Sequence, residues 1–428
     1  MKNRLCITHR FDGMALRVLF YITIIVALSG VACKSAKNSH AARSSPIVVS
    51  SDFDSGSIDT LWESRPNFLT GWPKHWKQKS SSDDQYYWFY FKLNNVVNKN
   101  ITIKLDSLAG IYRGGPHLIY TKGTQPVYSY NQKNWERIND VRYDSKLHSL
   151  SFRNLFKQDS VWIAYAHPFS YGQGLALIDS IAGNQFLTIE TLGTTLQGRN
   201  INLLTVTDTT VPDAEKKVVF ITTLQHAGEY CGGYVVSGLL NFLLSDNNNA
   251  ALARKTTVYK IIPMMNPDGI FHGITRFNGN YEDLNQEWDD DFTDTLHLPV
   301  EPEAACVKKW IRDWRSSGRN IDIGLDIHSQ GQQGSMNLLH TPKGMLADFT
   351  PHLNTYWPVK YIPVEFSGSL NDCLAKEFHI SSGTFEIPQS GINNEAYLTI
   401  DDYYNYGKGI ALGITDYLTK LSKKSLAE

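Results

Sequence analysis

The chain has 428 residues, of which 42% are hydrophobic and 19% are charged, and its formal net charge is −1. This composition is typical of a folded globular protein and excludes an intrinsically disordered chain. Because there is no excess of basic residues to neutralise phosphates, it also argues against nucleic acid as a partner.

Residues 1–32 are predicted to be a signal peptide. Basic residues precede the uncharged apolar run Val18–Ala32, whose length suits a signal-peptide core better than a membrane span of about 20 residues. Cys33 follows at once, so the segment resembles a bacterial lipoprotein signal with a lipid anchor on Cys33 and a polar linker at 33–46. Ordinary cleavage after Ala32 and an uncleaved anchor are the alternatives. All three predict an exported protein, periplasmic or at the outer membrane or cell surface.

Residues 47–192 are predicted to form a small all-β domain. Short runs rich in aromatic and β-branched residues are separated by turn signals such as "RGGP" and "GNQ". These runs lie at 86–93, 101–108, 161–168 and 185–192. Several strands without intervening helices favour a β-sandwich.

Residues 193–424 have a different pattern, in which strands alternate with helices. Continuous apolar runs at 217–224 and 321–328 suit strands that are buried on both faces, and a further strand begins at 257. Helices are expected at 234–244, 301–314 and 401–421. The alternation predicts an α/β domain with helices on both faces of a mixed sheet.

Two histidines and a glutamate stand at the ends of predicted strands. In "QHAGEYCGG", His226 directly follows one strand and Glu229 comes three residues later, while His328 ends another strand in "LDIHSQG". Zinc in a hydrolase takes three such ligands and keeps one position for water, and α/β sheets place their sites at the carboxyl ends of strands. Gly232 and Gly233 would allow a close approach or a sharp turn. The alternatives are a polar turn and a hydrogen-bonded structural histidine.

Glu386 lies in the short strand-like run "SSGTFEIP". A carboxylate near a metal-bound water can take its proton and later pass it to the leaving group. From this segment alone, a surface acid on a strand is the simpler interpretation.

The order of these segments resembles the zinc carboxypeptidase family. The catalytic motifs appear in the family's order as "QHAGE", "IIPMMNPDG", "TRFNGNYEDLNQEW", "LDIHSQG" and "GTFEIP". The segments "FDSGSID", "WFYFKL", "PVYSYNQKNWERI" and "IAYAHPFSY" are similar to the β-sandwich that precedes the catalytic domain in the branch containing the cytosolic carboxypeptidases. The resemblance covers most of the chain from about residue 50 and implies a zinc carboxypeptidase-like domain after the sandwich.

The resemblance also implies a role for individual residues. One zinc ion would be held by His226, Glu229 and His328. Glu386 matches the general base, and Arg276, in "TRFNG", matches the arginine that stabilises the oxyanion, because a fixed cation lowers the energy of developing negative charge.

Further family positions carry over around "EDLNQ". Asp283 matches an acid that orients the first histidine ligand, and Asn285 matches a substrate-contacting asparagine. Gln286 departs from the pattern, because the family has an arginine there that binds the substrate's terminal carboxylate, and a neutral amide cannot replace its charged fork. For the family's substrate-contacting tyrosine, Tyr361 and Tyr397 match by rough position only.

These residues predict a zinc-dependent hydrolase that attacks an amide or ester carbonyl without requiring a free C-terminal carboxylate. Its substrate would be a peptide, a cell-wall fragment or a glycan. A conventional carboxypeptidase with another basic residue as clamp and a carbohydrate esterase or deacylase are alternatives. A non-catalytic surface binding protein is the alternative from another class, and the intact ligand set counts against it.

Overall fold

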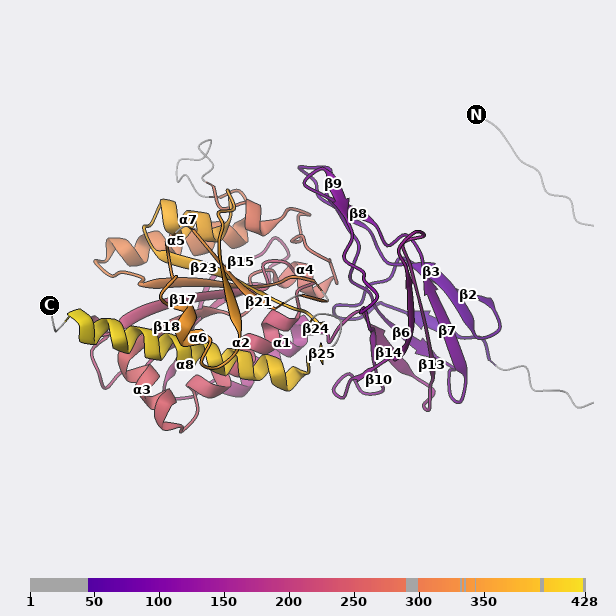
Figure 1. Ribbon diagram of the computed structural model, residues 1–428, viewed down its shortest axis with the longest axis horizontal. Coiled ribbons are helices and arrows are strands. Elements are labelled where there is room, and N and C mark those ends of the chain that lie inside the picture. Colours follow the sequence, from indigo (N-terminus) through magenta and orange to yellow (C-terminus); the bar gives the residue numbers. More distant parts are fainter. Residues whose placement is uncertain are drawn as a thin grey trace, which may run out of the picture. The chain divides into compact units, whose positions relative to one another are not determined.

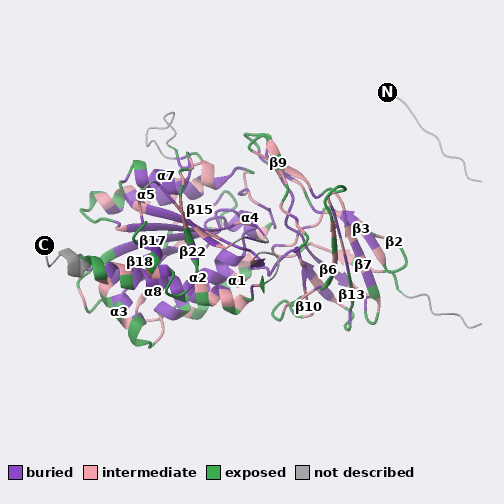
Figure 2. Ribbon diagram, viewed as in Figure 1, coloured by how far each residue is buried: buried purple, intermediate pink, exposed green. Residues whose placement is uncertain are grey.

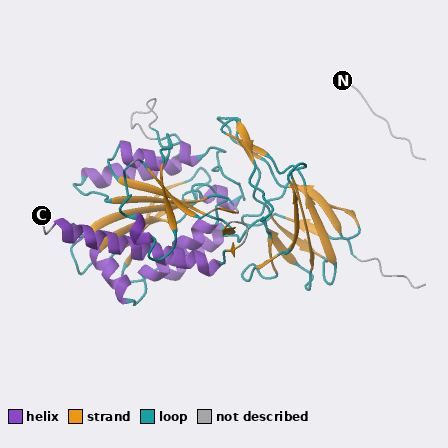
Figure 3. Cartoon of the chain, in the orientation of Figure 1, coloured by secondary structure: helices purple, strands orange, loops and turns teal. Residues whose placement is uncertain are grey.

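A computed structural model of the protein describes residues 45–289, 299–331, 333–334, 336–342, 344–392 and 396–425. The predicted signal peptide, Cys33 and residues 33–44 of the predicted linker lie outside the described residues. Residues Ser45–Glu428 make one compact unit by their contacts. Within it, an N-terminal domain built of strands precedes a C-terminal domain that contains both strands and helices (Figures 1 and 3). Within the described ranges, no helix combines the length and the apolar character needed to cross a membrane.

The N-terminal domain contains two five-stranded sheets and a smaller four-stranded sheet. In spatial order, the first sheet consists of β1 (Val48–Ser50), β6 (Tyr90–Asn94), β14 (Val161–Ala164), β10 (Val127–Ser129) and β11 (Glu136–Arg137). The second consists of β12 (Asp140–Asp144), β13 (Ser149–Leu155), β7 (Asn100–Leu105), β3 (Phe68–Trp72) and β2 (Thr60–Arg65). The small sheet consists of β4 (Trp76–Lys77), β5 (Asp84–Gln85), β8 (Gly110–Tyr112) and β9 (Gly115–His117).

Alternation along the strands explains the core of the N-terminal domain. Ile103 and Leu105 of β7 are buried, and they lie opposite Phe152 and Leu150 of β13 in the antiparallel register. Because successive side chains of a strand point to opposite faces, these residues form one apolar face. Phe89 stacks on Phe152 with their ring centroids 6.2 Å apart. The expected all-β domain is confirmed.

The C-terminal domain is organised around an eight-stranded mixed sheet. Its strands are, in spatial order, β15 (Leu187–Thr194), β16 (Asn200–Val206), β18 (Thr257–Ile262), β17 (Lys217–Thr223), β19 (Ile323–Ser329), β23 (Ser381–Ile387), β21 (Asn337–Thr341) and β22 (Val359–Pro363). The central strands β18, β17, β19 and β23 are parallel. A separate three-stranded sheet contains β20 (Gln333–Gly334), β24 (Gly391–Ile392) and β25 (Ala396–Tyr397).

Helices cover both faces of the large sheet (Figure 1). The helices are α1 (Tyr171–Ile181), α2 (Cys231–Leu243), α3 (Asn248–Thr256), α4 (Pro267–Phe271), α5 (Pro302–Ser316), α6 (Thr350–Leu353), α7 (Leu370–Lys376) and α8 (Ile400–Ser425). Val219 and Ile221 of β17 belong to the apolar cluster that includes α2 and α8, whereas Val218 and Phe220 belong to the cluster that includes α5 and α7. From Val218 onward the strand is therefore buried on both sides, as Figure 2 shows for the interior of this sheet, and the predicted α/β architecture is confirmed.

Two features differ from the expectations. The strand expected at 185–192 within the sandwich is β15, which pairs with β16 at the edge of the large sheet. Its residues are mostly exposed or half-buried, so its side chains carry little information about the sheet to which it belongs. Helices α1, α3 and α7 were not expected, because they are short and their apolar periodicity is weak.

Several contacts join the two domains within the compact unit. The Ser55 hydroxyl donates to the Ile270 carbonyl at 2.8 Å, and Arg137 Nη2 donates to the Leu398 carbonyl at 2.7 Å. The ring of Trp88 packs on that of Tyr230 with centroids 4.1 Å apart. These contacts pack the N-terminal domain against the C-terminal domain.

Candidate active site

The loop after β17 carries the first two candidate ligands. From β17 the sheet continues to β18 on one side and to β19 on the other, and open α/β sheets bind ligands where the strand order changes direction in this way. Leu224, directly after β17, has φ 59°, which is a left-handed conformation that branched residues rarely adopt. This bend carries the chain away from the strand just before His226.

Helix α2 packs unusually close to the strands below it. A Cβ atom at Gly232 would lie 2.2 Å from the Thr223 hydroxyl oxygen, and one at Gly233 would lie 2.2 Å from Cδ1 of Phe169. Both distances are far below van der Waals contact. The two glycines therefore allow helix α2 to pack closely against Thr223 and Phe169, whereas the bend after β17 is made by Leu224.

His226, Glu229 and His328 come together at the ends of β17 and β19. His226 Nδ1 lies 2.8 Å from Glu229 Oε1, and His328 Nδ1 lies 3.0 Å from Glu229 Oε2. The two Nδ1 atoms are 3.0 Å apart, and all three side chains are buried. The Ser329 backbone N–H donates to Glu229 Oε2 at 2.9 Å, which orients the carboxylate.

The other nitrogen of each imidazole faces a carboxylate. His226 Nε2 lies 3.1 Å from Asp283 Oδ1, and His328 Nε2 lies 2.6 Å from Asp326 Oδ2. Each acid can accept a proton from the Nε2 that it faces, and in that tautomer both Nδ1 lone pairs are available to bind one cation. Two imidazole nitrogens and a carboxylate oxygen are a donor set that fits zinc.

Asp326 is a site residue that the sequence reasoning missed. It lies two positions before His328 on β19, so both side chains point to the same face of the strand. The Thr222 hydroxyl donates to Asp326 Oδ1 at 2.7 Å, and Gln225 Nε2 donates to Oδ2. The acid–x–histidine spacing at the end of a predicted strand was the available signal.

Asp283 connects several predicted site residues. Its carboxylate accepts hydrogen bonds from Arg276 Nε at 2.7 Å and from Gln286 Nε2 at 2.7 Å, as well as facing His226. Burial disfavours the charged form of Asp283, but Arg276 and His226 outweigh it and hold the pKa of this acid well below its usual range. Asn285 lies beside this network, where its Oδ1 accepts the Leu370 N–H at 3.1 Å.

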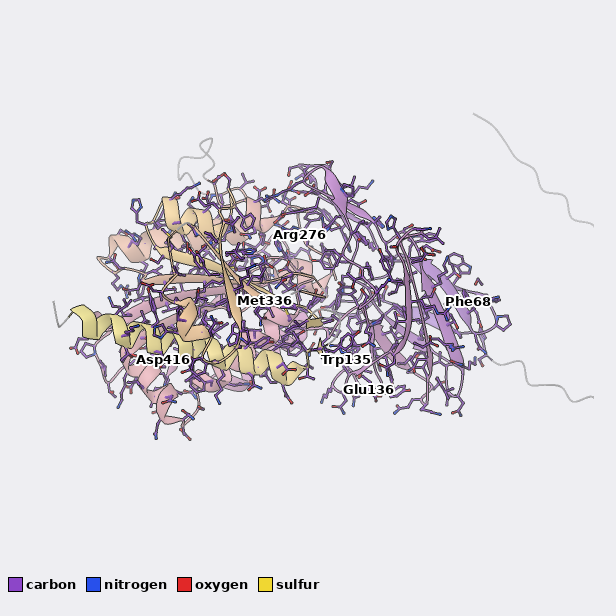
Figure 4. The ribbon with its side chains drawn as sticks, viewed as in Figure 1. Phe68, Trp135, Glu136, Arg276, Met336 and Asp416 are labelled. Atoms are coloured by element: carbon purple, nitrogen blue, oxygen red, sulfur yellow. The ribbon has the colours of Figure 1, made fainter. Side chains whose placement is uncertain are left out.

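Arg276 is the buried cation next to the ligand set. It lies after α4 and is labelled in Figure 4. Burial opposes its charge, but Asp283 raises the pKa of the guanidinium above its usual value. Its Nη2 donates to the Tyr112 hydroxyl at 3.3 Å, so an N-terminal domain residue helps to hold it.

Glu386 lies on β23, directly across the parallel ladder from His328. Burial, followed by the nearby Glu229 carboxylate, raises the pKa of Glu386 to about 7. An acid with this pKa can both accept and release a proton near neutral pH. Burial also opposes the charge of Glu229, but His226 and His328 outweigh it and lower the pKa of that carboxyl below its usual value.

A pocket of about 360 Å³ opens over these groups. Six of the predicted site residues line it: His226, Glu229, Arg276, Asn285, Gln286 and Glu386. His328 and Asp283 lie against them. The N-terminal domain contributes Tyr87, Tyr112, Arg113, His117 and Ile119 to the lining.

The two tyrosines that matched by rough position do not line this pocket. The Tyr397 hydroxyl donates to the Gly123 carbonyl at 3.2 Å, and the Tyr361 hydroxyl accepts the Gly344 N–H at 3.3 Å. Tyr87 and Tyr112 line the pocket instead. Sequence reasoning could not find them, because they belong to the other domain.

Two family models match the chain in succession. Residues 49–166 match the cytosolic carboxypeptidase N-terminal domain, and residues 175–419 match the zinc carboxypeptidase family. The second match alone covers more than half of the chain. It confirms the resemblance that the motifs indicated and, with the donor set above, zinc as the cofactor.

Individual proteins agree with the family models. The chain is 29% identical over 259 residues to human cytosolic carboxypeptidase 6, covering 56% of this chain and 49% of that protein. It is 30% identical over 263 residues to the Caenorhabditis elegans protein of the same name, covering 58% and 55%. The chain thus spans only about half the length of these relatives.

Solved structures share the fold over both domains. A metallo-carboxypeptidase from Burkholderia cenocepacia superposes with a TM-score of 0.74 at 21% identity, covering 88% of this chain and all of that one. A putative carboxypeptidase A from Shewanella denitrificans gives a TM-score of 0.72 at 25% identity, covering 87% and 99%.

The comparisons contradict the expected export. The relatives are named cytosolic carboxypeptidases, and the N-terminal domain matches the domain model of that name. An apolar run behind basic residues reports only the hydrophobicity of a segment, and this property alone does not determine where a protein resides. The prediction of a periplasmic or surface lipoprotein was therefore wrong.

Proposed function

Because the chain belongs to the zinc carboxypeptidase family, we propose that it is a zinc-dependent peptidase that removes residues from the C-terminus of peptides. One observation supports this most directly. Glu386 and Arg276 line the same pocket as His226 and Glu229, so a base, a cation and metal ligands all face one substrate.

In this proposal His226, Glu229 and His328 would hold the zinc ion, while Asp283 and Asp326 would orient the two imidazoles. Bound zinc supplies a Lewis acid that polarises the scissile carbonyl and acidifies a water molecule.

Glu386 carries the proton in this proposal. It takes the proton of the attacking water and passes it to the leaving amine, a cycle that a carboxyl group with a pKa of about 7 can complete near neutral pH.

Arg276 stabilises the negative oxygen that forms during attack. Its guanidinium is held by Asp283 and by the Tyr112 hydroxyl, so it needs little reorganisation when charge develops. Asn285 and Gln286 line the pocket as substrate-contacting residues, although the Gln286 amide nitrogen is already bonded to Asp283.

Glu386→Gln tests this proposal. Zinc content and the hydrolysis of N-acylated peptides are measured for the wild type and the variant, with Glu190→Gln on the exposed edge strand β15 as a matched control. We expect Glu386→Gln to keep its zinc and to lose about 10²–10⁴ in kcat, because only the proton carrier is removed. A wild type without bound zinc, or unchanged hydrolysis by Glu386→Gln, contradicts the proposal.

A second candidate is hydrolysis of an amide or ester that has no free carboxylate, such as an acylated sugar or a cell-wall fragment. Gln286 supports it, because a neutral amide offers a donor and an acceptor but no charge. The same assay separates the two candidates. Faster cleavage of amidated or esterified substrates than of the matching free acids would favour the second.

A further inference from the structure

Two arginines line the pocket, and their guanidinium groups differ in their hydrogen-bond partners. Arg276 is bonded through Nε to Asp283 and through Nη2 to Tyr112. For Arg113, the hydrogen bond found within the described part of the chain is made by the backbone N–H, to Asp83 Oδ1 at 2.7 Å. Its guanidinium lies 5.4 Å from the centroid of the Tyr112 ring and has no acidic partner among the described residues.

Two further basic groups of the pocket, His117 and His340, carry little charge near neutral pH. Burial, followed by the positive charge of Arg276, lowers the pKa of His117 to about 4. Burial also lowers the pKa of His340, with a further contribution from His328. Arg113 is therefore the uncommitted cation of the described pocket lining at physiological pH.

Gln286 cannot supply a charge for a substrate carboxylate. It is neutral, and its amide nitrogen donates to Asp283 at 2.7 Å. An anionic group entering this pocket would meet the carboxylates of Glu229 and Glu386 with no compensating side-chain cation besides the two arginines. Arg276 is bonded to Asp283 and is assigned to the oxyanion in the proposed function, so Arg113 is the pocket arginine left to bind a substrate carboxylate.

Arg113 occupies an unfavourable backbone conformation at the tip of the β8–β9 hairpin. Tyr112 pairs with Gly115, so Arg113 and Gly114 form a two-residue turn with φ values of 49° and 75°. Asn-Gly is the usual sequence of such turns, because both positions require left-handed backbone. An arginine at the first position is strained, and strain of this kind concentrates at functional sites.

The hairpin is held at both sides of its tip. The Tyr112 hydroxyl accepts a hydrogen bond from Arg276, and buried Asp83 accepts the Arg113 N–H. These bonds place the base of the Arg113 side chain on the pocket wall while leaving its guanidinium exposed. The N-terminal domain thus presents a positive charge to the site of the C-terminal domain.

We infer that Arg113 is a specificity-determining residue that binds a carboxylate of the substrate, either the terminal α-carboxylate or an acidic side chain next to the scissile bond. The inference rests on the proposed function, because it assigns the substrate chemistry of the same pocket. Arginine suits this role, since its planar fork can donate two parallel hydrogen bonds to a carboxylate.

Arg113→Asn tests the inference with little risk to folding, because asparagine is well tolerated in this turn. Arg65→Asn, on β2 of the same domain and away from the pocket, is the matched control. The zinc-loaded proteins are assayed on four N-acylated peptides that end in glutamate or glutamine, each with a free or an amidated C-terminus. Binding of the same peptides is measured by calorimetry in a Glu386→Gln background, which removes turnover.

We expect Arg113→Asn to raise KM, and to weaken binding, about tenfold or more for peptides that carry the recognised carboxylate, with kcat nearly unchanged. If KM and binding change only for the peptides with a free C-terminus, Arg113 binds the α-carboxylate. If they change only for the peptides that end in glutamate, and not for those that end in glutamine, Arg113 binds the acidic side chain. An equal effect on all four peptides, including the amidated glutamine peptide that has no carboxylate, overturns the inference.

The two proposals can fail separately. A wild type that hydrolyses none of the peptides contradicts the proposed function, whereas Arg113-dependent binding in the Glu386→Gln background still supports the carboxylate site. Hydrolysis and binding that Arg113→Asn leaves unchanged overturn the inference and leave the proposed function intact.

Discussion

The wall of the pocket that carries the proposed metal ligands is buried and densely hydrogen-bonded, whereas the wall supplied by the β8–β9 hairpin is partly exposed and has few polar contacts. His226, Glu229 and His328 each have polar partners on more than one side. Arg113 and Gly114, at the tip of the hairpin, are exposed. The difference shows that the first wall is held rigidly by many hydrogen bonds, while the side chain at the hairpin tip is constrained by few of them.

Of three substitutions that test this difference between the walls, Asp326→Asn should have the largest effect, and it acts on the zinc affinity of the buried wall. The variant keeps the shape of the side chain but loses the charge that places a proton on His328 Nε2, and the loss of such a partner typically lowers metal affinity about 10–100-fold. Zinc competition with a chromophoric chelator measures the change. The control is Asp322→Asn, because Asp322 lies just before the same strand and is bonded to Lys217. If Asp326→Asn binds zinc as tightly as the wild type, Asp326 does not support His328 as a ligand.

His117→Gln should have an intermediate effect, and it probes the hairpin wall. The folded-state pKa of His117 lies at about 4, below its ordinary value of 6.5, because of burial and then of Arg276. Between about pH 4 and 6.5 the histidine therefore binds more protons in the unfolded chain than in the folded protein. For this reason His117 lowers the free energy of unfolding as the pH falls from about 6.5 towards 4.

Removing that cost should make His117→Gln more stable than the wild type at pH 4.5 by about 1–2 kcal/mol, a figure reduced for the partial exposure of the ring. The difference should shrink above pH 7. Denaturant unfolding at both pH values measures it, with His352→Gln on α6 as a control outside the pocket. A wild type and variant with parallel pH dependence would contradict the assignment of acid sensitivity to this wall.

Tyr112→Phe should have the smallest effect, because it removes a single hydrogen bond between the two walls. The hydroxyl accepts a hydrogen bond of 3.3 Å from Arg276, but Asp283 still holds that guanidinium. We expect kcat/KM to fall about two- to fivefold and zinc affinity to stay unchanged. Tyr397→Phe is the control, and a loss of zinc in Tyr112→Phe would mean that the hairpin also maintains the ligand geometry.

The sequence predicted those site residues that stand at the end of a recognisable apolar strand. His226 and His328 follow or end strands that are buried on both faces, and such runs are visible in a single sequence. Glu386 was ambiguous by itself and became informative only through the order of the motifs. Asp326 was within reach of the same reasoning, because alternation along β19 puts it on the face of His328.

The hairpin residues were beyond that reasoning. Tyr112 and Arg276 are separated by 164 positions in the chain, and no local pattern connects them. The edge strand β15 was difficult for a related reason: its side chains are mostly exposed or half-buried, so the alternation that would assign it to a sheet is weak. Contacts between distant segments depend on how the domains pack, which local propensity does not encode.

The sequence by itself determined the two-domain order and the α/β class of the second domain, and it predicted which side chains to propose as zinc ligands and proton carrier, because these inferences depend on residue chemistry and short-range periodicity. Only the tertiary structure decided that Gln286 is bonded to Asp283, that Asp326 completes the pair of acids behind the histidines, and that Arg113 faces the pocket from the other domain. The physical reason is that charge and hydrogen bonding act through space, and the groups that they join lie far apart along the chain.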